Sequence, residues 1–89
     1  GYNCEIGQDE IMNLKKLQKL NANRNSKIIN VNHLANSLIV LYCGGNCGID
    51  QNGIKKLKKL KKIYAHNNKK INNVNHLANT LIKLDCGGD

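Results

Sequence analysis

Apolar and polar residues alternate in two distinct ways along the chain. Leu20 and Ala22 alternate with Asn21 and Asn23, and this period of two is typical of a short β-strand. In the stretch before it, residues 10–20, apolar residues recur at spacings of three and four, which predicts a helix. Residues 53–63 repeat that spacing. The sequence therefore predicts helix, turn, strand and turn in succession.

The chain also repeats itself. LANSLIVLYCGG at residues 34–45 returns as LANTLIKLDCGG at residues 77–88, and a shift of 43 residues aligns 4–46 with 47–89 without a gap. More than half of the aligned pairs are identical. Inside each unit the pattern L-x-x-L-x-(small apolar)-x-x-N-x-x-I occurs at alternating steps of 21 and 22, with Ala at the central position of one copy and Cys in the other. Such a period predicts stacked units, none of which buries its apolar face alone.

This pattern resembles the leucine-rich repeat, over essentially the whole chain, and the LANSL and LANTL segments look like the FNIP variant of amoebae and giant viruses. Ala35 and Gly48 stand where that variant carries Pro, and its Phe is missing. The resemblance implies an α/β fold. It would be a right-handed solenoid of four coils, with a short parallel β-sheet on the concave face and helices or turns on the convex face. It also implies protein–protein recognition.

We expect residues 1–89 to form a single array of these repeats, with double repeats at 4–46 and 47–89. The chain starts and stops at the same point of the period, and neither end carries an obvious polar cap. Solenoids normally need capping repeats, so these ends indicate a segment of a longer array or a unit that stacks end to end.

A recurrent asparagine follows each predicted strand. The chain turns inward there, and an Asn side chain can both donate and accept hydrogen bonds to backbone groups that the turn would bury. We therefore predict a structural ladder of Asn25, Asn46, Asn68 and Asp89, in which an ionised Asp89 could only accept.

The outward positions of the strands form the candidate binding surface. Neighbouring strands lie ~4.8 Å apart, so Tyr42 and Tyr64 should sit side by side, flanked by lysines. Tyrosine on a rigid sheet is a good anchor for a protein partner. An ordinary solvated face is the competing interpretation. The predicted partner-binding residues are Lys19, Asn21, Asn23, Val40, Tyr42, Lys62, Tyr64, His66, Lys83 and Asp85.

The four cysteines fall into two classes. Cys43 and Cys86 occupy an inward strand position, whereas Cys4 and Cys47 follow the ladder position by one residue. The first interpretation is buried free thiols that pack as small apolar groups. A disulfide and a metal site are the alternatives, although a C-x3-C pair lacks a second pair of ligands nearby. We expect no cofactor and no metal.

The equivalent histidines, His33 and His76, are expected to be structural and to form hydrogen bonds in turns or lie on the convex surface.

The formal net charge is +8, and the run KKLKKLKK at residues 55–62 suggests nucleic acid or an anionic surface. The competing interpretation is that Leu57, Leu60 and Ile63 face the core and the lysines are solvated. No transmembrane segment and no signal peptide is evident in these residues, which together with free thiols weakly favours an intracellular location.

We therefore expect no enzyme but a protein–protein interaction module, with another protein or copies of itself as partner. The alternatives are a structural repeat that stacks into a filament and, less favoured, a basic nucleic-acid binder.

Overall fold

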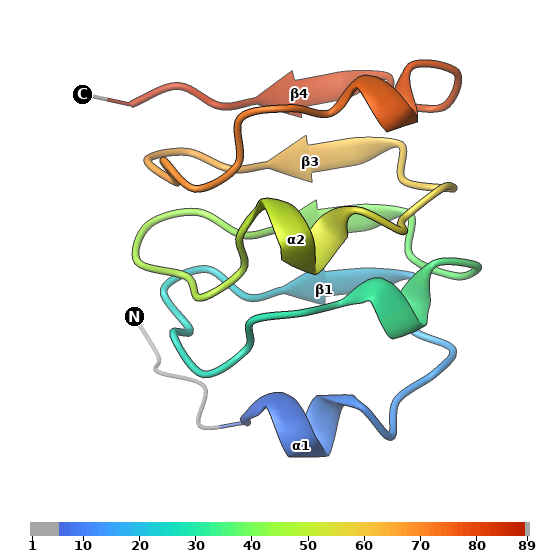
Figure 1. The fold of residues 1–89 in the computed structure, drawn as a ribbon, viewed down its shortest axis with the longest axis vertical. Helices are drawn as coiled ribbons and strands as arrows, with labels where there is room; N and C mark the ends of the chain where they lie inside the picture. The colour runs from blue at the N-terminus through green and yellow to red at the C-terminus, as the bar shows by residue number, and fades with distance from the viewer. Residues whose placement is uncertain (1–5, 89) are drawn as a thin grey trace.

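The computed structural model describes residues 6–88, which form a four-stranded parallel sheet with the strands in chain order (Figure 1). The strands are short, three residues each: β1 (Lys19–Asn21), β2 (Val40–Tyr42), β3 (Lys62–Tyr64) and β4 (Lys83–Asp85). Their central residues are paired in a single row of Leu20, Leu41, Ile63 and Leu84. The strands, the parallel sheet and the apolar row predicted from the sequence are confirmed.

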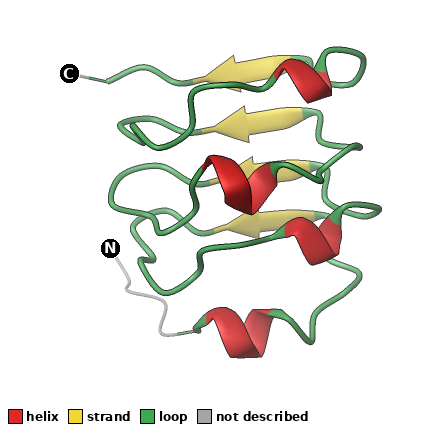
Figure 2. Cartoon of the chain, viewed as in Figure 1, coloured by secondary structure: helices red, strands yellow, loops and turns green. Residues whose placement is uncertain are grey.

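Short helical segments lie on one side of the sheet (Figure 2). Two are single α-helical turns, α1 (Gln8–Ile11) and α2 (Gln51–Ile54), and two are 3₁₀ turns, η1 (Asn32–Leu34) and η2 (Asn75–Leu77). Each helical turn, the strand after it and the next turn make one layer. We number these layer 1 (residues 7–28), layer 2 (29–49), layer 3 (50–71) and layer 4 (72–88).

The helices predicted over residues 10–20 and 53–63 are wrong in extent. In layer 3 the helix stops at Ile54, and residues 55–61 run back to the sheet without helical structure. Seven helical residues would advance the chain only about 10 Å, whereas the layer is part of a body 33 Å wide. An extended path carries residues 55–61 across the layer and still buries Leu57 and Leu60. Apolar residues three apart can therefore face the core from a non-helical chain as well as from a helix.

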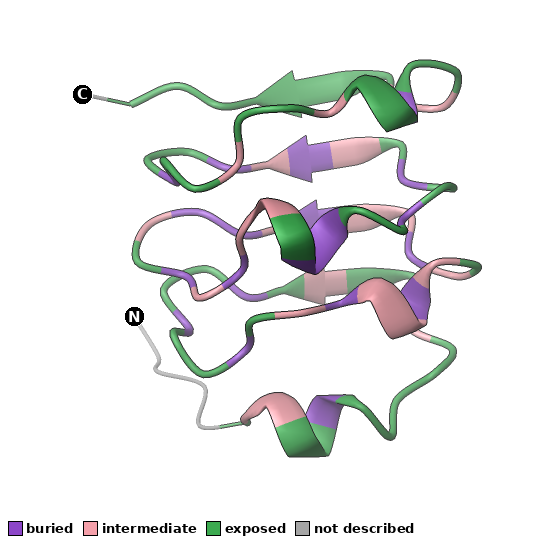
Figure 3. Ribbon diagram, viewed as in Figure 1, coloured by how far each residue is buried: buried purple, intermediate pink, exposed green. Residues whose placement is uncertain are grey.

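The core lies between the sheet and the helical turns and is almost entirely aliphatic. Its buried members come mainly from layers 2 and 3, and burial falls off towards both ends of the stack (Figure 3). This distribution follows from the repeat, since each layer buries its apolar residues only against the layers on either side.

Polar side chains join the layers on the helical side, and they do so twice in the same way. Gln8 accepts hydrogen bonds from the backbone N–H groups of Ile29 and Asn30 and donates to the Asn30 carbonyl. Gln51 makes the equivalent three bonds one repeat later, to residues 72 and 73. The amide side chains thus satisfy backbone groups that have no partner within their own layer.

Candidate functional site

The outer face of the sheet, which points away from the core, carries a stacked pair of tyrosines. Leu41 and Ile63 point into the core, so Tyr42 and Tyr64, one residue later, point outward. Their rings stack with centroids 4.5 Å apart and planes inclined by 9°. The predicted juxtaposition of Tyr42 and Tyr64 is therefore confirmed. The ring spacing is close to that of neighbouring strands, because the two residues are direct partners in the sheet.

Tyr42 and Tyr64 lie in the middle of a row of four outward-pointing residues, and a polar residue lies at each end of that row. Asn21 of β1 is paired with Tyr42, and Asp85 of β4 is paired with Tyr64. The Asn21 side chain accepts a hydrogen bond from the Asn23 N–H (3.1 Å), so it serves its own turn. The Asp85 carboxylate lies 3.8 Å from His66 Nδ1, and both side chains are exposed.

A second outer row runs parallel to the tyrosines and is basic at three of its four positions. Lys19, Val40, Lys62 and Lys83 are successive partners across the four strands. Lys62 is half-buried beside the tyrosine row, whereas Lys19 and Lys83 are exposed. The row therefore presents positive charge along one flank of the aromatic pair.

An open pocket of about 180 Å³ lies on the other flank. It is lined by Asn23, Arg24, Gly44, Gly45, Tyr64, His66 and Asn67. A side chain at Gly44 would have its Cβ 2.7 Å from the His66 carbonyl oxygen, so glycine at this position keeps the two turns close together. Sequence reasoning identified Asn23, Tyr64 and His66 but missed Arg24 and Asn67, both of which have a left-handed backbone (φ 63°).

The predicted asparagine ladder is correct at two rungs and wrong at a third. Asn68 donates to the carbonyls of Cys43 (2.8 Å) and Ile49 (3.0 Å) and accepts from the Lys70 N–H (2.9 Å). Asn25 donates to the Ile6 carbonyl and accepts from the Lys27 N–H. Asn46, in contrast, is exposed. Asp89 lies outside the described residues.

The rung assigned to Asn46 is occupied by Cys47. Its Sγ accepts a hydrogen bond from the Ile49 N–H at 3.4 Å, the same contact to residue i+2 that Asn25 and Asn68 make. Cys47 is buried, and it lies 22 residues after Asn25 and 21 before Asn68. Alignment by identity placed Asn46 opposite Asn25. The recurrence of Cys at positions 4 and 47 could have indicated that the ladder position in this layer lies one residue later, at Cys47.

The two thiols of layer 2, Cys43 and Cys47, are unreactive at neutral pH. Burial, and to a smaller extent the neighbouring Cys47, raises the pKa of the Cys43 thiol to about 12. Burial also raises the pKa of Cys47, partly offset by the hydrogen bond from Ile49 and by Lys70. Both thiols are therefore protonated and poorly nucleophilic at neutral pH. Cys86 is exposed, not buried as predicted, since no described residue packs on the far side of layer 4, and Cys4 lies outside the described residues.

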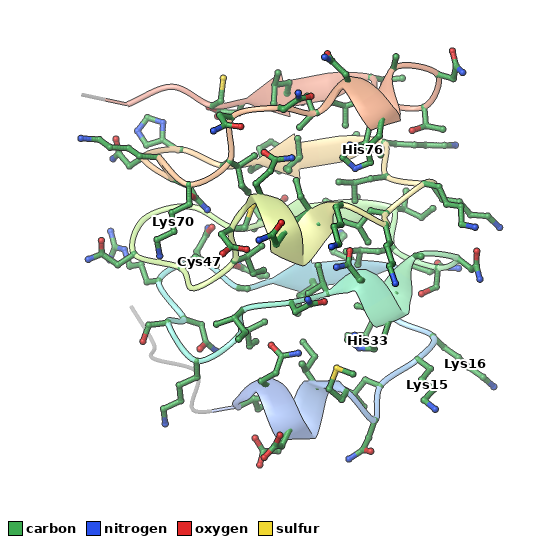
Figure 4. The ribbon with its side chains drawn as sticks, in the orientation of Figure 1. Lys15, Lys16, His33, Cys47, Lys70 and His76 are labelled. Carbon is green, nitrogen blue, oxygen red and sulfur yellow. The ribbon has the colours of Figure 1, made fainter. Side chains whose placement is uncertain are left out.

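Each of the two repeated histidines joins its layer to the one before (Figure 4). His33 Nε2 lies 2.9 Å from the Ile11 carbonyl, and His76 Nε2 lies 3.1 Å from the Ile54 carbonyl. Both rings must carry the proton on Nε2 to donate these bonds. The prediction of a structural role for both histidines is confirmed.

The lysine run at residues 55–62 lies mostly away from the tyrosine pair. Lys55, Lys56, Lys58, Lys59 and Lys61 are exposed, whereas Leu57, Leu60 and Ile63 are buried, as the solvated-face interpretation predicts. Among residues 6–88, no three His, Cys, Asp or Glu side chains gather as metal ligands. No helix in the described part of the chain is long and apolar enough to cross a membrane.

Scanning the chain against protein-family models and searching curated proteins and solved structures gave no match.

Proposed function

We propose that the chain is a segment of a leucine-rich-repeat solenoid that binds a protein partner through the outer face of its sheet. The fold part of this proposal is supported by the repeated leucine pattern, by parallel strands in chain order and by the turn after each strand. Leucine-rich repeats carry Asn or Cys at the position after the strand. Asn25, Cys47 and Asn68 alternate between these two residue types at one structural position.

The stacked tyrosine pair is the observation that carries the binding function. Tyr42 and Tyr64 form the only aromatic contact among the described residues, and they form it on the solvent side of the sheet. Each ring is already held by its neighbour, so little conformational entropy is lost when a partner covers the pair. Rigid aromatic groups of this kind are typical anchors of protein interfaces.

The charges around the pair favour an acidic partner. Lys62 flanks the tyrosines on one side, and Arg24 and His66 line the pocket on the other. With a net charge of +8 for the chain, an acidic protein segment would be steered towards this face. The expected partner therefore offers carboxylates on either side of an apolar or aromatic side chain.

The proposal is tested by replacing Tyr64 with a photo-crosslinking amino acid and identifying the proteins captured from cells. A candidate is then titrated against the purified chain while tyrosine emission is followed, which is possible because the chain has no Trp. We expect Tyr64→Ala to weaken binding at least tenfold, as loss of an interface anchor usually does.

The matched control is Lys59→Ala, an exposed residue of the lysine run. It should leave affinity nearly unchanged, and both variants should retain the parent far-UV circular dichroism. If Lys59→Ala weakened binding as much as Tyr64→Ala, the outer face would not be the binding surface. Binding to nucleic acid that Lys59→Ala weakens and Tyr64→Ala leaves unchanged would favour the lysine run instead.

A further inference from the structure

The pocket beside the tyrosine pair is a hollow over two glycines inside the stack. Two consecutive residues after each strand line it, and they are Asn23 and Arg24 in layer 1, Gly44 and Gly45 in layer 2, and His66 and Asn67 in layer 3. Layers 1 and 3 have side chains at both positions, whereas layer 2 has none. The space of about 180 Å³ is what those missing side chains leave between layers 1 and 3.

The hydrogen-bond acceptors around the hollow are already occupied. The Gly44 carbonyl accepts from the Arg24 N–H (3.1 Å), and the His66 carbonyl accepts from the Gly45 N–H (2.8 Å). The Asn23 side-chain oxygen accepts from the Gly44 N–H (2.7 Å). Within residues 6–88, the Asn23 NH₂ group and the Arg24 guanidinium make no hydrogen bond or ion pair. The hollow therefore offers donors and suits a ligand that accepts.

Arg24 is the only arginine in the chain, and the other thirteen basic residues are lysines. Its backbone is left-handed (φ 63°), as are those of Gly45 (φ 66°) and Asn67 (φ 63°) at the equivalent position of the next two layers. Glycine and asparagine adopt this conformation readily, whereas arginine has no such preference. The turn thus gives no reason for an arginine. What arginine adds over lysine is a planar fork of donors that matches a carboxylate.

The glycine at position 45 leaves room for the Arg24 side chain. A Cβ at position 45 would lie 3.2 Å from Arg24 Cγ, so the stem of Arg24 lies against this glycine. A larger residue there would occupy the hollow and displace the arginine. The bare turn of layer 2 and the single arginine of layer 1 therefore belong to one arrangement.

The charges at the hollow favour an anion with a single negative charge. Arg24 is the one permanently charged residue among those that line it. His66 also lines the hollow, but its Nδ1 lies 3.8 Å from the Asp85 carboxylate, which offsets any charge on the imidazole. A carboxylate therefore matches the charge of the site, whereas a phosphate monoester carries about −1.5 to −2 at neutral pH.

The hydrogen bonds of layer 2 favour a side-chain carboxylate over a chain end. Terminal carboxylates are typically captured by free backbone N–H groups, and those of Gly44 and Gly45 are already used. The hollow also has room for a whole acidic side chain, since about 180 Å³ exceeds the ~150 Å³ of a cavity that admits benzene.

We propose that this hollow is a carboxylate-binding subsite, in which the Arg24 guanidinium holds the side-chain carboxylate of one Glu or Asp residue of the protein partner. Two parallel hydrogen bonds come from Arg24 and a further one from the Asn23 NH₂ group. Tyr64 lines the same hollow, so the bound acid lies next to the residue that packs on the tyrosine pair. The inference rests on the proposed partner binding and deepens it, because Arg24 rather than overall charge selects the acidic residue.

The first test is an NMR titration that needs no knowledge of the partner. The probe is N-acetyl-glutamate N-methylamide, and its neutral match is N-acetyl-glutamine N-methylamide, both at constant ionic strength. The single arginine gives one Nε–H signal, and we expect the acidic probe to shift it with a Kd of about 10 mM, as suits one charge-assisted contact. No saturable shift up to about 100 mM, or an equal shift by the neutral probe, would overturn the subsite.

Two probes test the identity of the anion. N-acetyl-glycine has its carboxylate at a chain end, and inorganic phosphate carries a larger charge. We expect both to bind more weakly than N-acetyl-glutamate N-methylamide under the same conditions. Tighter binding of either probe at the Arg24 signal would overturn the assignment of a side-chain carboxylate.

Substitutions at Arg24 separate the fork from the charge and from the fold. Arg24→Lys keeps the charge, and we expect it to weaken probe binding about fivefold, followed at the Gly45 amide, because the fork is lost. Arg24→Asn should abolish binding without lowering the urea midpoint, since Asn67 holds the same conformation in layer 3. Unchanged binding in Arg24→Lys, or a lowered midpoint in Arg24→Asn, would overturn the role given to Arg24. Lys58→Gln, which removes a charge at an exposed site, is the control.

The subsite and the tyrosine anchor fail in different experiments. Saturable binding of the acidic probe supports the subsite even where a photo-crosslinker at Tyr64 captures no protein. Capture at Tyr64 together with no probe binding would keep the partner-binding face and overturn the subsite. In a chain that shows both, Arg24→Asn should weaken binding of the captured partner about tenfold, as loss of a charged contact at an interface does.

Discussion

The turns that follow β2 and β3 both bring the chain back against the preceding layer, but they use different chemistry there. The turn after β3 uses a side chain: the Asn68 amide donates to two carbonyls of layer 2. The turn after β2 uses the backbone: the Gly48 N–H donates to the Asn25 carbonyl at 3.1 Å, while Cys47 packs behind it. A polar side chain and a close backbone approach are thus two solutions to one requirement.

The difference also fixes which residue each turn can tolerate. The Asn68 side chain is long enough to reach the carbonyls of the previous layer, so the backbone of its turn can stay further away. The next residue, Lys69, is therefore exposed, and its side chain is not restricted by layer 2. Cys47 is smaller and donates no strong hydrogen bond. The backbone of its turn must therefore come closer, and Gly48 is the residue that allows it. We infer that the 43-residue period, rather than a 21- or 22-residue one, reflects this alternation of turn chemistry.

The largest expected effect on stability comes from removing the Asn68 side chain. Asn68→Ala leaves the buried carbonyls of Cys43 and Ile49 without that donor and the Lys70 N–H without its acceptor. Each unsatisfied buried group costs roughly 1–3 kcal/mol, so we expect the free energy of unfolding to fall by about 3 kcal/mol. Urea unfolding followed by circular dichroism measures the change.

Asn25→Ala provides the matched comparison. The Asn25 side chain has the same acceptor role and a donor bond to the Ile6 carbonyl, at the outer layer of the stack. We expect a smaller loss than for Asn68→Ala, because the groups uncovered at this end can reach water more readily. Equal losses would mean that position in the stack has no influence on the ladder.

The next largest effect comes from blocking the close approach of the Gly48 backbone to layer 1. A Cβ at Gly48 would lie 2.5 Å from the Ser26 carbonyl oxygen and 2.7 Å from that of Ile28. Gly48→Ala should therefore push layer 2 from layer 1 and cost about 2 kcal/mol, within the range found for overpacked interiors. The same urea experiment measures it, with Lys69→Ala at the corresponding position of the other turn as control. Lys69→Ala should be nearly neutral; a loss equal to that of Gly48→Ala would show that the two turns do not differ in this way.

Much of this architecture could be predicted from the sequence, because stacking makes the same demand in every layer. The strand positions, the inward leucines and the tyrosine pair all follow from a repeat whose strands lie in chain order. Side chains alternate between the two faces of a strand, so shifting one strand by a residue would expose its leucine. The pattern therefore carries the sheet register as well as the strands.

What the sequence did not reveal depends on distances within a layer. The spacing in KKLKKLKK suits a helix as well as the extended path that is observed, and only the width of the layer decides between them. The Cys47 rung was missed because identity aligned Asn46 with Asn25, while packing aligns Asn25 with a thiol. Arg24 lines the pocket and has a left-handed backbone, and nothing about an arginine at this position indicates that conformation.

The effect that is smallest near neutral pH concerns the thiols that fill the Cys-type layer, and it appears only at alkaline pH. Burial raises the pKa of Cys43 from an ordinary value of 9.0 to about 12. The folded chain therefore holds this proton more tightly than the unfolded chain. Its contribution to stability is complete below pH 9 and is lost as the pH rises from 9 towards 12, at about 1.4 kcal/mol per pH unit.

Cys43→Ala isolates this contribution from other groups that titrate in the same range, since both proteins share them. The variant should be less stable than the parent at pH 8, because it loses packing in the core. The gap should narrow as the pH is raised above 9, when the parent pays to keep a protonated thiol. Urea unfolding at pH 8, 9.5 and 10.5 measures the difference. A gap that stayed constant would mean that the Cys43 thiol is not desolvated, and that the interior of the Cys-type layer admits water where the asparagine ladder excludes it.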